Sequence, residues 1–166
     1  MEKGSQARIG NQVKGVEEEP RLIYQMTKRR RKVVIRRVNH IGIVVRNVYE
    51  ALAHYDKLFE FVSVVHVETL PDQGVKVAVV PLDNVEIELI EPIDPQTGVA
   101  KFLEKRGEGL HHISFEVDDI NETLKSLGQK GTQLIDREAR EGIRGKRAFI
   151  HPSSTKGVLI ELAHIE

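Results

Sequence analysis

Hydrophobic and polar residues follow the same pattern in two distant parts of the chain. HIGIVVRNVYEAL at residues 40–52 matches HISFEVDDINETL at 112–124 with an offset of 72 residues. VEIEL at 85–89 matches VLIEL at 158–162 with an offset of 73. The near-constant offset indicates an internal duplication. Each copy begins with a strand that carries a histidine and ends with a strand that carries a glutamate.

Both copies predict the same order of secondary structure. Alternating strands at 38–45 and 110–117 each lead into a segment whose apolar residues recur at helical spacing. Three β-like runs follow in each copy: 62–68, 75–81 and 85–91 in the first, and 132–137, 146–151 and 157–163 in the second. We therefore predict an α+β fold in which two βαβββ modules pair into a curved mixed sheet.

The two modules account for most of the chain. We assign module 1 to residues 38–92, a linker to 93–109 and module 2 to 110–166 of a single domain. The linker contains VAKFLEKR at 99–106, which predicts a short helix. Residues 1–37 hold 11 Lys/Arg and 4 Asp/Glu. We interpret them as a disordered basic leader and expect no nucleic-acid partner, because no aromatic residues interleave with the arginines to stack on bases.

Period-two alternation along the strands sorts the side chains onto two faces. The apolar residues of each module share the face that packs under its helix. The opposite face carries His40 and Glu88 from module 1, and His112 and Glu161 from module 2. His111 alternates with His112 and is expected on the other side of its strand. If the sheet curves around the polar face, four ligand-type side chains converge in one cup.

Two imidazoles and two carboxylates are a good ligand set for a divalent first-row metal such as cobalt, manganese, nickel or zinc. The chain has no cysteine, which excludes thiolate ligands, disulfides and a cysteine nucleophile. Any one of the four residues alone is more commonly structural. Four at matching positions of a duplicated unit favour a metal centre, with open coordination positions left for substrate oxygens.

Other function classes lack their sequence signals. The chain has no G-x-G-x-x-G, P-loop or G-x-S-x-G motif. Its apolar runs are too short to span a bilayer, and its first residues lack the apolar stretch of a secretory signal. Together with the absence of cysteine, these features lead us to expect a cytoplasmic protein without a membrane partner.

Several stretches resemble one enzyme family: NHIGIVV, IELIEP, FLEKRGEGLHHISFEVDDI, GKRAFIHP and GVLIEL. They are similar to the methylmalonyl-CoA epimerases of the vicinal-oxygen-chelate superfamily, which has the glyoxalase/bleomycin-resistance fold, and the resemblance covers residues 38–166. It implies that His40, Glu88, His112 and Glu161 are the metal ligands and that Glu161 is also a catalytic acid–base residue. It further implies an acyl-CoA substrate, a homodimer, and epimerisation by α-proton abstraction with enolate stabilisation.

The chain departs from this family at one catalytic position. Some bacterial epimerases carry a further glutamate on the strand after QGV, where this chain has Val77 beside Lys76. The identity of the second acid–base group is therefore open, with a metal-bound water and Glu86 as weaker alternatives. A cationic segment, REAREGIRGKR, supplies four side chains that could meet the phosphates of coenzyme A: Arg140, Arg144, Lys146 and Arg147.

Two other functions stay open at this stage. A glyoxalase-type lactoylglutathione isomerase would use the same metal and the same enolate chemistry. A metal-free module that sequesters a small drug could use the same cup, although it would not need all four ligand-type residues. A ring-cleaving dioxygenase is disfavoured because its iron has only two histidines and one carboxylate. Metal content and a thioester assay separate these alternatives.

Overall fold

The computed structural model describes residues 35–59 and 66–165. Most of the predicted leader, residues 1–34, lies outside this range, but residues 35–37 belong to the first strand. The elements in chain order are β1 (Ile35–Val44), α1 (Val48–Phe59), β2 (His66–Leu70), η1 (Pro71–Gln73), β3 (Val75–Pro81), β4 (Glu86–Pro92), α2 (Gly98–Arg106), β5 (Gly109–Val117), α3 (Ile120–Gln129), β6 (Arg140–Gly142), β7 (Gly145–Ile150), η2 (Pro152–Ser154) and β8 (Leu159–Ile165).

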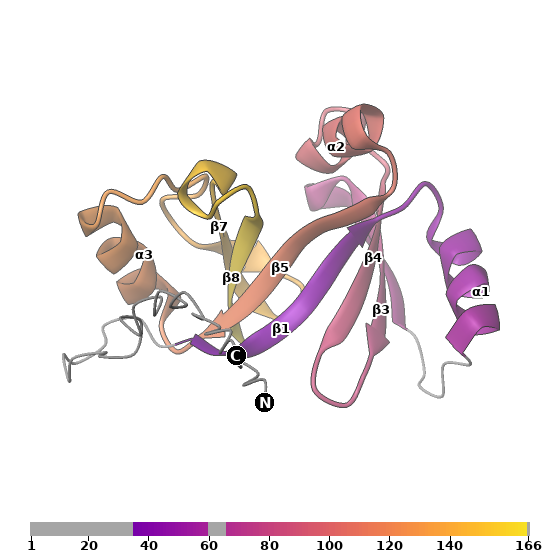
Figure 1. Ribbon diagram of the computed structural model, residues 1–166, viewed down its shortest axis with the longest axis horizontal. Coiled ribbons are helices and arrows are strands. Elements are labelled where there is room, and N and C mark those ends of the chain that lie inside the picture. The colour runs from indigo at the N-terminus through magenta and orange to yellow at the C-terminus, as the bar shows by residue number, and fades with distance from the viewer. Residues whose placement is uncertain (1–34, 60–65, 166) are drawn as a thin grey trace, which may run out of the picture. The chain divides into compact units, whose positions relative to one another are not determined.

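All the named strands belong to one sheet with the order β2-β3-β4-β1-β5-β8-β7-β6. Within each module the histidine strand pairs in parallel with the glutamate strand, β1 with β4 and β5 with β8. The modules join where β1 and β5 pair in antiparallel fashion, so the histidine strands are neighbours at the centre of the sheet. Figure 1 shows the two halves of the sheet meeting along this pair. The predicted pair of βαβββ modules in one curved mixed sheet is confirmed.

Helices α1 and α3 begin at side-chain caps. The side chain of Asn47 accepts hydrogen bonds from the backbone N–H groups of Tyr49 and Glu50. Asp119 accepts one from the N–H of Glu122. These carboxamide and carboxylate oxygens satisfy donors that have no partner within the first helical turn. Each helix therefore starts directly after its histidine strand, as the sequence predicts, and covers the face of the sheet away from the histidines.

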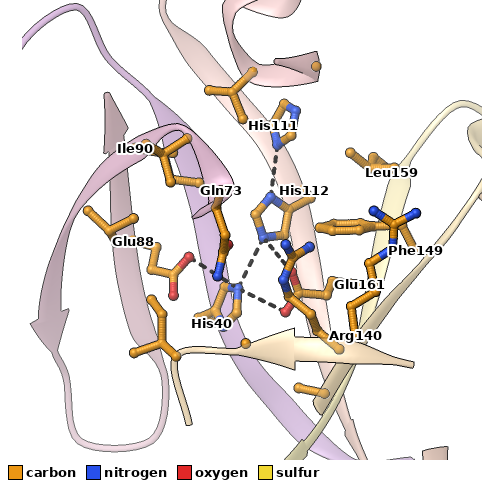
Figure 2. Close-up of a pocket in the computed structure, with 18 of the residues that line it drawn as sticks. His40, Gln73, Glu88, Ile90, His111, His112, Arg140, Phe149, Leu159 and Glu161 are labelled. Carbon is orange, nitrogen blue, oxygen red and sulfur yellow. Dashed lines mark hydrogen bonds and ion pairs between the residues drawn. The ribbon is translucent and has the colours of Figure 1, made fainter. Parts of the chain in front are cut away.

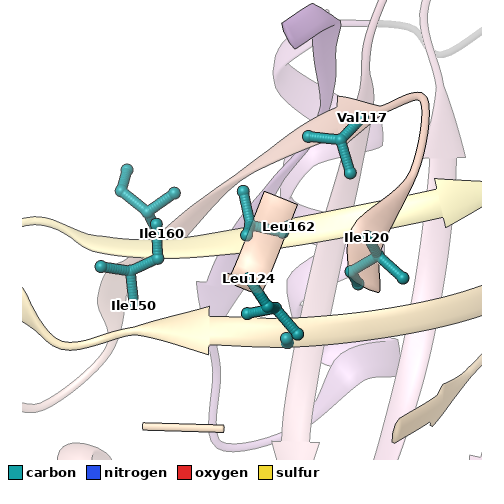
Figure 3. Close-up of a cluster of buried hydrophobic side chains, with 7 residues drawn as sticks. Val117, Ile120, Leu124, Ile150, Ile160 and Leu162 are labelled. Carbon is teal, nitrogen blue, oxygen red and sulfur yellow. The ribbon is translucent and has the colours of Figure 1, made fainter. Parts of the chain in front are cut away.

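The core consists of the apolar faces predicted from alternation. Under α3, buried Ile120 and Leu124 pack against Val117, Ile160 and Leu162 of the sheet (Figure 3). Under α1, the equivalent cluster is Val45, Val48, Ala78 and Leu89. Full burial of one such aliphatic side chain stabilises the folded state by about 1.5–3 kcal/mol. Because both clusters lie behind the sheet, its other face is free to carry polar groups.

Two predicted strands differ from the structure. Of the run at 62–68, residues 62–65 lie outside the described range, and β2 starts at His66. The run at 132–137 is not a strand: it forms only an isolated bridge between Leu134 and Ile150, and β6 comes later. The cause is Asp136, whose buried carboxylate accepts the backbone N–H of Phe149 at 3.0 Å. The carboxylate of Asp136 thus accepts the N–H of Phe149 in place of the backbone carbonyl that would accept it in a β-ladder.

No helix within the described residues has both the length and the apolar character needed to cross a membrane.

Candidate metal centre

The four predicted ligands lie on the four central strands of the sheet. In the pairing register, Gly42 of β1 has two partners, Glu88 of β4 and His112 of β5. Glu161 of β8 is the partner of Ser114, which in turn pairs with His40. The histidine of each module therefore lies level in the sheet with the glutamate of the other module. Figure 2 shows the side chains of His40, Glu88, His112 and Glu161 pointing toward one another.

The ligand atoms of this cluster are close together. The Nε2 atoms of His40 and His112 are 3.0 Å apart. From the Nε2 of His40, the Oε2 of Glu88 is 3.5 Å away and the Oε1 of Glu161 is 3.6 Å away. The Oε2 of Glu161 is also 3.6 Å from the Nε2 of His112. His40, Glu88 and His112 each offer a ligand atom within 4.8 Å of the others. The structure thus brings together all four residues that the sequence singles out.

Gly42 provides the space for the imidazole of His112. A Cβ atom built on Gly42 would lie 2.3 Å from the Cε1 and 2.5 Å from the Nδ1 of His112. Neither distance is compatible with van der Waals contact. A side chain at this position would therefore push the imidazole of His112 out of the cluster. The sequence alone did not reveal this role of Gly42.

We expect Gly42→Ala to weaken metal binding while the protein still folds. The methyl group displaces His112, and a displaced ligand should lower metal affinity by at least about tenfold, since loss of an outer-shell partner alone typically costs 10–100-fold. Calorimetric titration with cobalt or zinc measures the effect. Gly128→Ala is the matched control, because a Cβ at Gly128 meets nothing within 4 Å. Equal metal affinity in both variants would show that His112 is not held by this close approach.

Both histidines have a partner for the ring nitrogen that faces away from the cluster. The Nδ1 of His40 donates to the side-chain oxygen of Asn39 at 2.8 Å, which leaves its Nε2 without a proton. The Nδ1 of His112 is 2.9 Å from the Nδ1 of His111, so the proton between them can belong to either ring. When His112 donates to His111, both Nε2 lone pairs point into the cluster. Metal-bound histidines in proteins commonly have such a partner on the second nitrogen.

His111 is not on the opposite side of its strand, as alternation predicted, but lines the same cavity as His112. The register between β1 and β5 moves from Gly42–His112 to Ile43–Leu110, so His111 is an extra residue in β5. A bulge of this kind turns two successive side chains toward one face. The prediction of its side was therefore wrong, and the contact between the two Nδ1 atoms places His111 next to the predicted ligand His112.

Burial shifts the titration of the whole cluster. It lowers the pKa of His40 to about 4 and that of His112 well below its ordinary value. Burial, with a smaller contribution from the neighbouring carboxylate of Glu88, raises the pKa of Glu161 to about 8. Burial also raises the pKa of Glu88 to about 7. Desolvation thus favours the neutral form of every member, and a bound cation would favour the ionised carboxylates instead.

The chemistry of these donors fits a divalent metal ion. The two imidazoles are neutral near pH 7, and their Nε2 atoms share one small space with two carboxylates. Two bare nitrogen lone pairs at 3.0 Å repel each other unless a proton or a metal ion lies between them. Nitrogen and oxygen donors without thiolate suit the first-row metals predicted from the sequence. The four residues can therefore hold such an ion as a mixed His/Glu centre.

The cluster forms part of the lining of a cavity of about 720 Å³. Seven Lys/Arg and four Asp/Glu line this cavity. The lining includes all four cations of the predicted segment, and three more come from α2: Lys101, Lys105 and Arg106. Val77 lines the cavity, whereas Lys76, its neighbour on the other face of β3, turns away toward Glu91 at 3.3 Å. The cavity is large enough for a small-molecule ligand and has an excess of positive charge.

Sequence analysis did not single out two other cavity residues. Gln73 of η1 has its side chain in the cavity, and the ring edge of Phe149 packs on His112 with the centroids 5.5 Å apart (Figure 2). Gln73 precedes a turn rather than lying within a strand, so alternation gives no face for it. Phe149 could have been found, because it alternates with two apolar residues of β7 that face the helix.

Comparison with known proteins gives one consistent result. Residues 39–150 match the family model of the Glyoxalase/Bleomycin resistance protein/Dioxygenase superfamily. The chain is 43% identical over 127 residues to an uncharacterised protein of Bacillus subtilis, YqjC, covering 76% of this chain and 90% of that one. It is 37% identical over 128 residues to the mitochondrial methylmalonyl-CoA epimerase of Bos taurus, covering 76% and 73%.

A solved structure agrees with these relatives. A variant of Streptomyces coelicolor methylmalonyl-CoA epimerase in complex with 2-nitronate-propionyl-CoA superposes with a TM-score of 0.75. Its sequence identity is 31%, and the match covers 80% of this chain and 96% of that one.

Proposed function

We propose that the chain, which belongs to the Glyoxalase/Bleomycin resistance protein/Dioxygenase superfamily, interconverts the two C2 epimers of methylmalonyl-CoA. The observation that supports this most is the cluster of His40, Glu88, His112 and Glu161 in a cationic cavity. Relatives at 37% and 31% identity are named as methylmalonyl-CoA epimerases, and one of them is described with an acyl-CoA derivative bound. An anionic acyl-CoA suits a cavity in which lysine and arginine outnumber acidic residues.

The reaction requires removal of a proton from C2 and its return on the opposite face. C2 lies between a thioester and a carboxylate, so its proton is acidic for a carbon acid. His40, Glu88, His112 and Glu161 would hold a divalent ion. When bound, the ion supplies a Lewis acid that polarises the thioester carbonyl and offsets the negative charge of the deprotonated substrate.

Glu161 is our assignment for one proton-transfer group. Its carboxylate is buried, and its Oε1 accepts a hydrogen bond from the hydroxyl of Ser114 at 3.2 Å, which limits its rotation. A positioned carboxylate of this kind typically contributes about 10²–10⁴-fold to the rate of proton transfer. Because a carboxylate that binds metal can still accept a proton through its other oxygen, Glu161 can be both ligand and base.

The second proton-transfer group does not come from the expected position. Val77 has no titratable group, and Lys76 turns away from the cavity toward Glu91. The carboxylate of Glu86 reaches the cavity but pairs with the guanidinium of Arg144 at 2.6 Å. Glu86 is therefore held as a partner for Arg144, which weakens the alternative in which it serves as the second base.

The direct test is a substrate comparison with the metal-loaded protein. We expect (R)-methylmalonyl-CoA to give a mixture of both epimers. A coupling enzyme that accepts only one epimer measures the conversion. The hemithioacetal of glutathione and methylglyoxal should not be converted to lactoylglutathione at a comparable rate. Conversion of the hemithioacetal without epimerisation of the thioester would replace this proposal with the glyoxalase alternative. Absence of bound metal together with neither reaction would favour the drug-sequestering module.

A further inference from the structure

Arg147 lies on the cavity wall in β7, two residues before Phe149, which pairs with the predicted metal ligand Glu161. Arg147 itself pairs with Ala163 of β8. Residues two apart on a strand share a face, and both Arg147 and Phe149 line the cavity. The guanidinium carbon of Arg147 is 5.5 Å from the ring centroid of Phe149, whose edge packs on His112. One aromatic ring therefore separates Arg147 from a predicted metal ligand.

Arg147 differs from two neighbouring arginines in its hydrogen bonding. Arg140 pairs with Asp136 at 2.8 Å, and Arg144 pairs with Glu86 at 2.6 Å. The Nε of Arg147 is buried and has no hydrogen-bond partner within residues 35–59 and 66–165. A buried donor of a charged group is unfavourable when it stays unpaired. Its position in the cavity wall indicates that a ligand supplies the missing acceptor.

The internal repeat makes the chemistry of this wall more specific. In module 1, Val77 pairs with Ile90 and Val79 pairs with Glu88, as Arg147 and Phe149 pair with Ala163 and Glu161 in module 2. Val77 is thus the counterpart of Arg147, and it is buried in a cluster with Val75, Val79 and Ile90. Equivalent positions of the two modules give the cavity one apolar wall and one cationic wall. A carbon that bears both a methyl group and a carboxylate is complementary to this pair of walls.

Charge balance leads to the same ligand. Two ionised carboxylates would offset a divalent ion, and the ion pairs of Arg140 and Arg144 are internally neutral. Arg147 then retains one uncompensated positive charge beside the centre. A guanidinium binds a carboxylate through two parallel hydrogen bonds, which suits its planar donors. The exposed cations of α2, Lys101, Lys105 and Arg106, suit the phosphates of coenzyme A at the edge of the cavity.

We propose that Arg147 binds the free carboxylate of the acyl group and so selects malonyl-type thioesters over neutral acyl thioesters. This inference rests on the proposed function, because it requires the acyl end of an acyl-CoA to lie next to the His/Glu cluster. It adds a specificity-determining residue outside the metal ligands, contributed by the wall of module 2.

Binding measurements with two thioesters test the role of Arg147. Malonyl-CoA and propionyl-CoA differ in the acyl carboxylate, and calorimetry with the metal-loaded protein gives a Kd for each. In the parent, malonyl-CoA should bind more tightly. Arg147→Met keeps the aliphatic stem and should weaken malonyl-CoA by at least about tenfold, as expected for a charged hydrogen-bonded pair. Propionyl-CoA should change by less than about twofold, and Arg147→Lys should retain part of the preference.

Arg106→Met is the matched control, because it removes the same charge from an exposed position of the cavity lining. It should weaken both thioesters to the same degree and leave their ratio unchanged. Thermal unfolding and metal content of each variant establish that the fold and the centre are intact. If Arg147→Met raised the Kd of both thioesters equally, the inference would be overturned, since Arg147 would then bind the coenzyme A portion that they share.

The same measurements separate this inference from the proposed function. If the parent epimerises methylmalonyl-CoA but Arg147→Met keeps the parent ratio of the two Kd values, only the role of Arg147 is refuted. If the parent binds neither thioester, the acyl-CoA substrate itself is refuted, and the inference about Arg147 fails with it.

Discussion

His40→Ala and His112→Ala should each abolish stoichiometric binding of a divalent metal. Each substitution removes one of two imidazoles whose Nε2 atoms are 3.0 Å apart at the centre of the cluster. Loss of an outer-shell partner alone typically costs 10–100-fold in metal affinity, so loss of a direct ligand should cost more. Elemental analysis after dialysis against a defined metal buffer measures the remaining metal.

The controls for this experiment address folding and non-specific binding. Neither histidine belongs to the two apolar clusters under α1 and α3, so both variants should unfold cooperatively when heated. His54→Ala removes an exposed imidazole from α1 and should retain the full metal content. If His40→Ala and His112→Ala both keep one metal ion per chain, these residues are not the metal ligands.

Glu161→Gln should lose proton exchange at C2 far more than it loses metal. The amide oxygen can still serve as a ligand, but the amide cannot take up a proton. We expect the rate of exchange to fall by about 10²–10⁴-fold, while metal affinity falls much less. Glu122→Gln makes the same change at an exposed position of α3 outside the cavity lining and should stay close to the parent. Exchange at the parent rate in Glu161→Gln would mean that Glu161 is only a ligand.

The same variant has an expected signature in the metal-free protein. Burial raises the pKa of Glu161 to about 8 in the folded state, whereas an exposed glutamate titrates near 4.5. The folded state therefore holds this proton more tightly than the unfolded state, and the resulting stability is lost as pH rises through about 8. Unfolding temperatures of the metal-free parent should fall as the pH rises from about 4.5 to about 8, and those of Glu161→Gln should fall less.

The internal repeat explains why so much of the site could be predicted from the sequence. Period-two alternation requires only a regular register, and the parallel pairs β1–β4 and β5–β8 have one across His40, Glu88, His112 and Glu161. Duplication then doubles the evidence for each position, since a residue type that recurs at the same place in both modules is unlikely to be there by chance. The convergence of the four side chains follows from the pairing of β1 with β5, which brings the two modules into one sheet.

The failures of prediction come from local exceptions to regular strands. The sequence around His111 does not indicate a bulge, because the extra residue is defined only by the register of β5 against β1. Asp136 likewise replaces a ladder hydrogen bond through a contact with Phe149, 13 residues away in the chain. The sequence also cannot distinguish Arg147, whose Nε has no partner among the described residues, from Arg140 and Arg144, which form ion pairs. That difference depends on tertiary contacts.

The central claim is metal-dependent proton exchange at C2 of methylmalonyl-CoA. It is tested most directly by incubating the substrate with the parent protein in D₂O and following C2 by proton NMR, once with cobalt or manganese bound and once after removal of metal by a chelator. We predict that deuterium replaces the C2 proton in the metal-loaded sample and that exchange in the metal-free sample is no faster than in buffer. The account would be contradicted by a metal-loaded protein that leaves the C2 proton in place, or by equal exchange with and without metal.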